Sequence, residues 1–193
     1  KTKLIKTCIT KAMNIPLSFV SLGGISDSSF LNGHNYTYEG ATYGKITESL
    51  IKAGVMNPVF LFDELDKVSN TSRGEEIINT LIHITDPIQN DRYNDKFFEE
   101  LDLDLSKSLI IFTYNDENLI NPILKDRMIT IRVPGYSAKE KMSICKDYII
   151  PELLPQYSLK KDDIVFEEKL LKTIVDTNTD DGVSVPTKTV IVN

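Results

Sequence analysis

Two short stretches of this chain are apolar at every position. Val59–Phe62 follows an Asn-Pro pair, and Leu109–Phe112 follows a polar segment. Apolar runs of this length, without polar alternation, are typical of strands buried on both faces of a sheet. Between the two runs, apolar residues recur at helical spacing and predict a helix that ends at Asp86-Pro87; they are Ile77, Ile78, Leu81, Ile82 and Ile84.

The flanking segments repeat this alternation of strand and helix patterns. Further strands are predicted at residues 17–22 and 128–133, and further helices at 3–13, 46–55 and 121–127. Residues 25–44 are polar and contain three glycines, which indicates a loop with room for one turn of helix. Strands separated by helices predict an α/β fold in which a parallel sheet is covered on both faces.

The pattern changes after Pro134-Gly135. From there it is helical only, with helices predicted at residues 137–150 and at about 167–176. We therefore expect two parts, an α/β core over residues 1–135 and a helical lid over residues 136–193.

Composition narrows the class of protein. The 193 residues carry a net charge of −6 and no run of Lys or Arg, which argues against a nucleic-acid-binding surface. No apolar run approaches the roughly 20 residues that span a bilayer. Two cysteines, Cys8 and Cys145, are too few for a disulfide framework, and we expect both thiols to be buried. We expect a cytoplasmic protein, although the mitochondrial matrix or another reducing compartment also fits.

Asp63 and Glu64 directly follow the first apolar strand. The carboxyl ends of parallel strands are where such sheets open to a ligand crevice. In nucleotide hydrolases an Asp at this place holds Mg²⁺, and a following Glu polarises the attacking water. The alternative is a strand that simply ends in charged residues, which is frequent. Asn115, which follows the second apolar strand, favours a nucleotide site, although an Asn taken alone there is typical of a turn.

The first two residues, Lys1 and Thr2, match the end of the phosphate-binding loop G-x-x-x-x-G-K-[ST]. Lys-Thr pairs are common in proteins, so this match gains its weight from the two carboxylates downstream. Together these residues predict the two halves of an ATP site.

Arg127 lies at the end of a short predicted helix, just before a strand. An exposed Arg in such a place can reach the γ-phosphate bound by a neighbouring subunit, and such a finger contributes roughly 10³–10⁵ in rate. The alternative is a surface salt bridge with Asp126 or Asp116.

Several longer segments are more specific than these single residues. The chain resembles the ATPase module of Lon-type AAA+ proteases nearly from end to end. The segments that carry the resemblance are GHNYTYEG (33–40), FDELDK (62–67), DPIQN (86–90), DLSK (104–107), LKDRM (124–128), PGYSAKEK (134–141) and IIP (149–151). The Asp-Pro-x-Gln-Asn and Asp-Arg-Met signatures are far more typical of Lon than of AAA+ proteins in general.

The resemblance implies a three-layer AAA+ P-loop NTPase core followed by a helical lid, with ATP and Mg²⁺ as cofactors. It implies a homo-oligomeric, hexameric ring that hydrolyses ATP to unfold and translocate polypeptide. Six residues would form the ATP site: Lys1 for the phosphates, Thr2 and Asp63 for Mg²⁺, Glu64 for the water, Asn115 as the sensor of the γ-phosphate and Arg127 as the finger. The Ser–Lys peptidase residues of such proteases lie outside these 193 residues.

The resemblance also concerns the centre of the sheet. In the AAA+ core the central strand precedes the phosphate-binding loop, so here it would precede Lys1. The strands at 109–113 and 128–133 are then expected to flank a gap. Because an unpaired buried backbone group costs about 1–3 kcal/mol, we expect the bare chain to aggregate or to be molten. We also expect it to bind ATP very weakly, because the glycine-rich amides that cradle phosphate would precede Lys1 as well.

Residues 33–44 resemble the axial pore loop that grips polypeptide in such rings, with Tyr38 as the gripping side chain. An aromatic ring contacts any polypeptide without reading its sequence; the alternative for Tyr38 is a packed surface tyrosine. Glu39 stands where Lon-type loops usually carry an aliphatic residue, and Ser184 stands where the lid usually carries a nucleotide-sensing Arg. Residues 69–74 resemble the second pore loop.

Three other functions stay open from the sequence. An AAA+ chaperone or remodelling ATPase without a peptidase would share the same module. A clamp-loader or helicase-like ATPase would act on nucleic acid, against which the acidic composition argues. A scaffold that binds nucleotide without hydrolysing it is compatible with the missing lid Arg.

Overall fold

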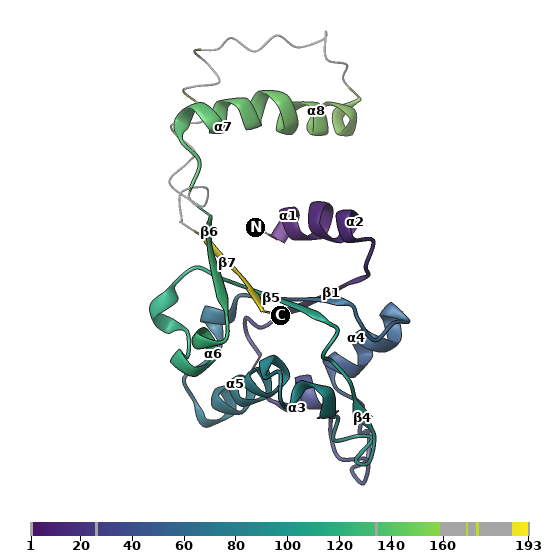
Figure 1. Cartoon of the computed structure of the whole chain (residues 1–193). Coiled ribbons are helices and arrows are strands. Elements are labelled where there is room, and N and C mark those ends of the chain that lie inside the picture. The colour runs from purple at the N-terminus through teal and green to yellow at the C-terminus, as the bar shows by residue number, and fades with distance from the viewer. Residues whose placement is uncertain are drawn as a thin grey trace. The chain divides into compact units, whose positions relative to one another are not determined.

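The computed structural model describes residues 2–25, 27–133, 135–158, 169, 173 and 187–192 (Figure 1). Contacts between residues divide the chain into two compact units, one formed by Lys1–Val133 with Thr187–Asn193 and the other by Pro134–Pro186. The first unit contains the main sheet and the candidate site.

A five-stranded sheet forms the centre of the first unit. Within the described residues its strand order is β1-β2-β5-β7-β6, with β1 Leu17–Ser21, β2 Val59–Asp63, β5 Leu109–Tyr114, β7 Thr187–Val192 and β6 Ile129–Val133. β1, β2 and β5 are parallel neighbours, with Leu17 beside Val59 and Val59 beside Leu109. The α/β fold with a parallel sheet is therefore confirmed for these strands.

β7 is antiparallel to both of its neighbours, β5 and β6. The two flanking strands therefore run in the same direction with one position between them, where the resemblance places a central strand. The gap expected at that position is filled by Thr187–Val192, whose Ile191 is beside both Ile111 and Ile129. This segment reads TKTVIV and is rich in β-branched residues, which favour strands. The expectation of a helical lid up to residue 193 did not include this strand.

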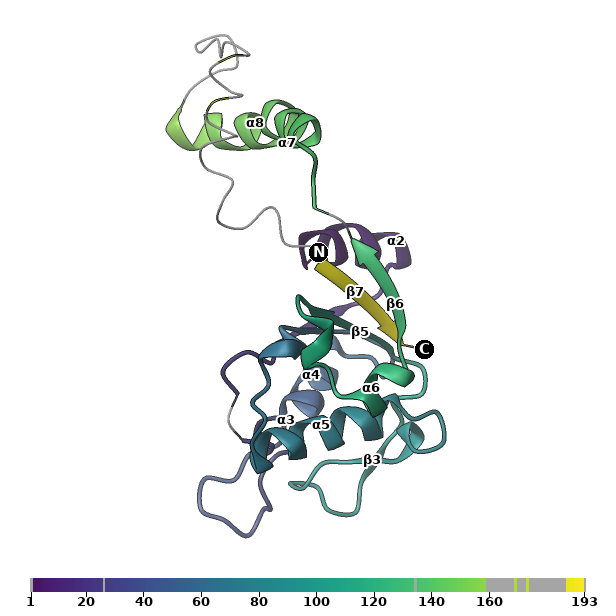
Figure 2. The same cartoon turned by 90° about the vertical axis from the view of Figure 1, so that its left-hand side faces the viewer.

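Helices cover both faces of the sheet (Figure 1, Figure 2). On one face lies the N-terminal helix, made of α1 Thr2–Leu4, the π-helical turn η1 Ile5–Ile9 and α2 Thr10–Met13. The other face carries α3 Ser29–Asn32, α4 Lys45–Ala53, α5 Ser72–Thr85 and α6 Pro122–Asp126. Shorter elements connect them: the 3-10 turns η2 Leu65–Lys67, η3 Asn90–Arg92 and η4 Glu117–Leu119, and an antiparallel pair of β3 Tyr93–Asn94 and β4 Asp102–Leu103.

The two apolar strands divide their side chains between these layers. Even-numbered positions are buried in the larger core with α3, α4 and α5; they are Phe60, Phe62, Ile110 and Phe112. Odd-numbered positions are buried against Ile5 of the N-terminal helix; they are Val59, Leu61 and Ile111. Successive residues of a strand point to opposite faces, so a strand that is apolar throughout gives a core to both layers.

The N-terminal helix buries Ile5 but not Cys8. Cys8 is exposed, so the prediction that both cysteines are buried is wrong. A π-helix turns by a smaller angle per residue than an α-helix, and the turn Ile5–Ile9 is π-helical. Cys8, three residues after Ile5, therefore falls short of the buried face.

The second unit is helical over its described N-terminal part, as predicted. It contains α7 Ala138–Ile144, the π-helical turn η5 Cys145–Ile149, α8 Ile150–Leu153 and η6 Leu154–Tyr157. Ser137 and Glu140 form a capping box in which the Ser137 amide donates to Glu140 Oε2 at 2.7 Å. Of the helix predicted at about 167–176, Lys169 and Thr173 are described, and both are helical. Among the described residues, no helix has the length and apolar character needed to cross a membrane.

Candidate functional site

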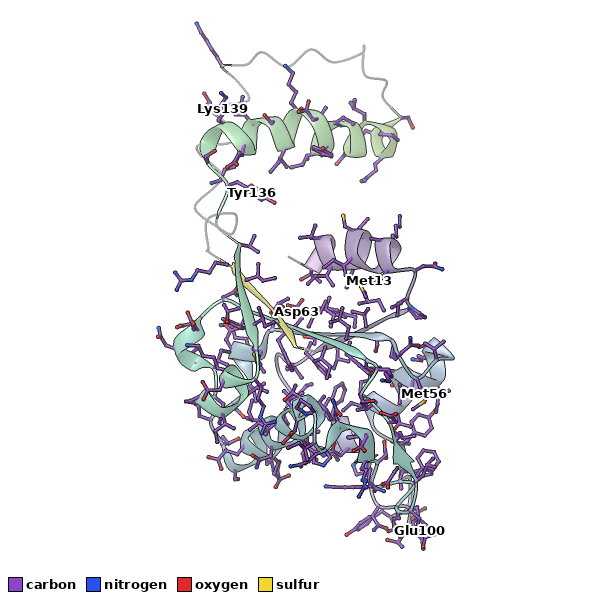
Figure 3. The ribbon with its side chains drawn as sticks, viewed as in Figure 1. Met13, Met56, Asp63, Glu100, Tyr136 and Lys139 are labelled. Atoms are coloured by element: carbon purple, nitrogen blue, oxygen red, sulfur yellow. The ribbon has the colours of Figure 1, made fainter. Side chains whose placement is uncertain are left out.

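Asp63 ends β2 at the carboxyl edge of the sheet, and its carboxylate joins three elements. Oδ2 accepts a hydrogen bond from the Thr2 hydroxyl at 3.0 Å. Oδ1 accepts one from the Thr113 hydroxyl, and another from the Glu64 amide at 3.1 Å. Figure 3 shows Asp63 in the region between the sheet and the N-terminal helix, which Thr2 opens. Thr2 and Asp63, which the sequence assigns to one magnesium site, are therefore in contact.

Thr113 is a residue of this site that the sequence pattern did not single out. The strand register explains its position, because Ser21 is beside Asp63 and Phe62 is beside Phe112, the residue before Thr113. Ser21, Asp63 and Thr113 therefore form a polar row across the carboxyl ends of β1, β2 and β5. A signal was present in the sequence, since Thr113 follows its apolar run just as Asp63 follows its own.

Glu64 follows Asp63 in the left-handed backbone region, with φ 62°. A residue other than glycine in this region costs on the order of 1–3 kcal/mol, and such strain is concentrated at functional sites. The Ser21 hydroxyl donates to Glu64 Oε2 at 3.4 Å. A Cβ on Gly23 would lie 2.1 Å from the same oxygen, so a side chain at this position would displace the carboxylate. The carboxylate thus lies beside the end of β1, where Ser21 contacts it and Gly23 leaves room for it.

Asn115 and Lys1 are the remaining predicted residues of the nucleotide site. Asn115 is exposed and directly follows β5, so it lies at the same edge of the sheet as Asp63. Lys1 lies outside the described residues. Their roles toward the phosphates stay predictions.

The side chains around Asp63 suit a magnesium ion. Mg²⁺ prefers oxygen ligands and commonly takes one or two carboxylates while it keeps several waters. Asp63 offers a carboxylate, and the Thr2 hydroxyl lies 3.0 Å from it. This donor set fits a Mg²⁺ ion whose remaining ligands are waters and phosphate oxygens.

Arg127 caps the C-terminus of α6 and pairs with Asp86, which caps the C-terminus of α5. Arg127 Nη1 lies 3.0 Å from Asp86 Oδ2. The Ile88 amide, which donates to Asp86 Oδ1, holds the pKa of Asp86 below its ordinary value, and the Arg127 guanidinium adds to this effect. Arg127 therefore does form a salt bridge, but with Asp86 rather than with Asp126 or Asp116. Its role as a finger stays a prediction.

The loop of residues 33–44 presents Tyr38 to solvent. Tyr38 is 69% exposed, which contradicts the alternative of a packed surface tyrosine. Glu39, next to it, is exposed as well. Tyr36 is 59% exposed and is a second aromatic side chain of the same loop, which the resemblance did not single out.

The predicted second pore loop, residues 69–74, is partly helical. α5 begins at Ser72 after Thr71, whose hydroxyl accepts a hydrogen bond from the Gly74 amide at 3.3 Å. A pocket of about 440 Å³ lies beside this segment and is also lined by residues 118–122. Ser184, at the position of the lid Arg, lies outside the described residues.

Known proteins with similar sequences point to one family. Residues 1–135 match the ATPase family associated with various cellular activities (AAA). The chain is 45% identical over 180 residues to a Lon protease homolog of Acanthamoeba polyphaga mimivirus, an alignment that covers 93% of this chain and 18% of that protein. It is 42% identical to Lon protease of Malacoplasma penetrans and 39% identical to Lon protease 1 of Bacillus subtilis, each over 91% of this chain and 22% of the relative. The chain thus spans about one fifth of the length of these relatives.

The family match contains the candidate site from Thr2 to Arg127. The similarity to Lon proteases covers 91% or more of the chain and so extends beyond the matched residues 1–135. The chain therefore belongs to the AAA family of ATPases, as an AAA+ module of the Lon type.

Proposed function

We propose that this chain is the ATP-hydrolysing motor module of an ATP-dependent protease of the Lon type, which unfolds and translocates polypeptide. The observation that carries the proposal is the contact between Thr2 and Asp63, which joins the start of a helix to the end of a buried parallel strand. The similarity to Lon proteases over 91% or more of the chain supports the protein class. A homo-hexameric ring and polypeptide substrates follow from that class and are part of the proposal.

In this proposal Thr2 and Asp63 hold Mg²⁺, and Lys1 binds phosphate oxygens of ATP. When bound, the ion would neutralise the charge that develops on the phosphate oxygens. Thr113 orients the Asp63 carboxylate, because its hydroxyl donates to Oδ1 while Oδ2 faces Thr2. A ligand carboxylate that is hydrogen-bonded in this way keeps its other oxygen aimed at the metal.

Glu64 polarises the water that attacks the γ-phosphate. Its backbone lies in the left-handed region directly after Asp63, and its carboxylate accepts a hydrogen bond from the Ser21 hydroxyl at 3.4 Å. Asn115, after β5, hydrogen-bonds the same water or the γ-phosphate. A positioned carboxylate of this kind contributes about 10²–10⁴-fold in rate as a general base.

Two side chains, the half-buried Arg127 and the exposed Tyr38, act outside their own ATP site. Arg127 keeps 29% of its side chain exposed while it pairs with Asp86, and it stabilises the γ-phosphate bound in the neighbouring subunit. Tyr38 contacts the translocated polypeptide. The free thiols of Cys8 and Cys145 fit a reducing compartment such as the cytoplasm.

The test compares Glu64→Gln with Asp91→Asn in the full-length protein. Glu64→Gln keeps the size of the side chain but removes its charge, so ATP binding should persist while turnover falls by about 10²–10⁴-fold. Degradation of a folded protein should be lost together with turnover. Asp91→Asn, at an exposed acid outside the candidate site, should change neither. Turnover close to wild type in Glu64→Gln would remove Glu64 from the proposed role.

A further inference from the structure

We propose that Asp95 is a positioning residue that fixes the direction in which the loop 33–44 presents its exposed tyrosines. The inference rests on the proposed function, in which this loop contacts polypeptide. Asp95 lies in the insert, defined as residues 93–105, which contains β3 and β4 and precedes β5. The insert extends away from the sheet, with Glu100 near its far end (Figure 3).

Asp95 is completely buried, and donors from the end of the loop and the start of α4 surround its carboxylate. Oδ2 accepts from the Gly44 amide at 2.8 Å and from the Thr47 hydroxyl at 2.5 Å. Oδ1 accepts from the Phe97 amide at 3.0 Å. A buried carboxylate without such partners is strongly unfavourable, so these donors cannot leave Asp95 without a large cost in free energy.

The same carboxylate lies at the N-terminus of α4. α4 begins after Gly44, which has no side chain to accept a hydrogen bond from the first turn. Asp95 instead accepts from the amide of Gly44 itself and from the Thr47 side chain, and a negative charge near a helix N-terminus is favourable. The direction in which the loop enters α4 is therefore set by a residue of the insert.

The two ends of the loop come too close together to allow side chains there. A Cβ on Gly44 would lie 2.0 Å from the carbonyl oxygen of Leu31, and a Cβ on Gly33 would lie 2.4 Å from Asp95 Oδ1. Both contacts are far shorter than any Cβ contact, so both positions require glycine. The two ends of the loop are so tightly packed that they have few alternative arrangements. A shift of the Asp95 side chain therefore moves the whole loop.

Farther from the sheet, the insert braces the loop at two more places. The Asn35 side chain donates to Glu99 Oε1 at 2.6 Å. The Tyr43 ring stacks on Phe98 with ring centroids 6.2 Å apart, and it meets Phe97 edge-on at the same distance. The exposed tyrosines of the loop lie between these two braces in the sequence, so their direction depends on where the insert holds the loop.

The functional test is Asp95→Asn in the full-length protein. The amide side chain has the same size as the carboxylate but carries no charge. Its NH₂ group would also face one of the groups that donate to Asp95, so that hydrogen bond would be lost. We expect basal ATP turnover close to wild type, because Asp95 lies outside the ATP site. We expect the stimulation of turnover by polypeptide to fall about two- to thirtyfold, the range in which residues between two sites change their coupling.

A second measurement reports on the loop itself. The 193 residues contain no tryptophan, so Tyr38→Trp places a fluorescent ring at the tip of the loop, after any tryptophan elsewhere in the full-length protein is replaced by Phe. Adding Asp95→Asn should lower the fluorescence anisotropy of that ring, because the loop moves more freely. The anisotropy measurement needs no polypeptide substrate, so it tests whether Asp95 positions the loop independently of the proposed function. Tyr38→Ala with unchanged degradation of a folded protein would instead count against the function of the loop.

Milder variants keep the test decisive if Asp95→Asn does not fold. Thr47→Val removes one donor to the carboxylate and should act in the same direction, whereas Thr47→Ser keeps the hydroxyl and should behave as wild type. Glu100→Ala, an exposed acid at the far end of the insert, is the matched control and should change nothing. Equal losses of basal and stimulated turnover, or unchanged anisotropy at residue 38 in the variants that fold, would overturn the proposal.

Discussion

Arg127 and Asp86 form an ion pair of 3.0 Å that joins the C-terminal ends of α6 and α5. Asp86 belongs to the Asp-Pro-x-Gln-Asn segment and Arg127 to the Asp-Arg-Met segment, the two most Lon-like signatures of the sequence. Two motifs that look independent in the sequence are therefore one structural unit, in which the first holds the side chain of the second.

Asp86→Asn should lower ATP turnover in the full-length protein without weakening ATP binding. The guanidinium loses its anionic partner, and a misplacement of about 1 Å far from the chemistry can cost up to ~10²-fold in rate. Turnover and nucleotide affinity, measured beside Arg127→Ala, check this prediction. Rings mixed from Asp86→Asn and Glu64→Gln subunits should recover part of the activity, because some interfaces then pair an intact Glu64 with a well-held Arg127. Mixed rings that stay inactive would contradict action on a neighbouring subunit.

The same ion pair predicts how stability changes in acid. In the folded protein the hydrogen bond from the Ile88 amide lowers the pKa of Asp86, and the Arg127 guanidinium lowers it further by a smaller amount. A carboxyl whose pKa is lowered by folding stabilises the fold above its unfolded pKa of about 3.9, and this contribution is lost as the pH falls through the lower folded value. The difference in unfolding free energy between wild type and Asp86→Asn should therefore be constant near neutral pH and shrink below about pH 4. Denaturant unfolding across this range measures it, and a difference that persists in acid would rule out this linkage.

Gly23→Ala should damage catalysis more than stability. The new Cβ would lie 2.1 Å from Glu64 Oε2, and the flexible end of an exposed side chain moves away more easily than the backbone. We expect a loss of turnover of up to ~10²-fold with little change in the melting temperature.

Gly24→Ala is the matched control for Gly23→Ala and should reduce stability more than catalysis. Nothing lies within 4 Å of its new Cβ, but its φ of +80° is unfavourable for alanine. We expect a loss of about 1–2 kcal/mol of stability with turnover retained. Equal turnover in the two variants would show that Gly23 does not position Glu64.

Tyr38→Ala should separate ATP turnover from work on the substrate. Basal turnover should persist and degradation of a folded protein should be abolished, since the ring touches only polypeptide. Glu39→Val should strengthen engagement of polypeptide, because it removes a charge beside that ring. Tyr157→Ala, at a ring with 72% exposure in the second unit, is the control and should leave degradation unchanged. Unchanged degradation in Tyr38→Ala would mean that this exposed ring has no part in gripping.

The layers of the fold could be predicted from local pattern alone. A strand that is apolar at every position, such as Val59–Phe62, must have a core on each face, and the structure has helices on both. The same pattern places Asp63 at the strand end, because a carboxylate cannot enter the buried part. The role of the loop around Tyr38 came instead from its resemblance to the Lon-type pore loop, which rests on the contiguous segment 33–40.

The support of the site could not be predicted in this way. Thr113 acts on Asp63, Gly23 makes room for Glu64, and Asp95 holds the base of a loop more than fifty residues before it. Each of these contacts joins segments that are distant in the sequence, so no local period or motif reports it. The pairing of β7 also joins segments that are distant in the sequence. The composition of β7 predicts a strand, but it does not predict the strands with which β7 pairs.

The position of β7 has a consequence for studies of this module in isolation. Its two neighbours run in the same direction, and backbone ladders can be completed by a strand of either polarity. The backbone groups at the centre of the sheet can therefore pair with a strand of either direction. A second β-forming segment joined to this chain would compete with Thr187–Val192 for that place, and the length of the linker would set its effective concentration.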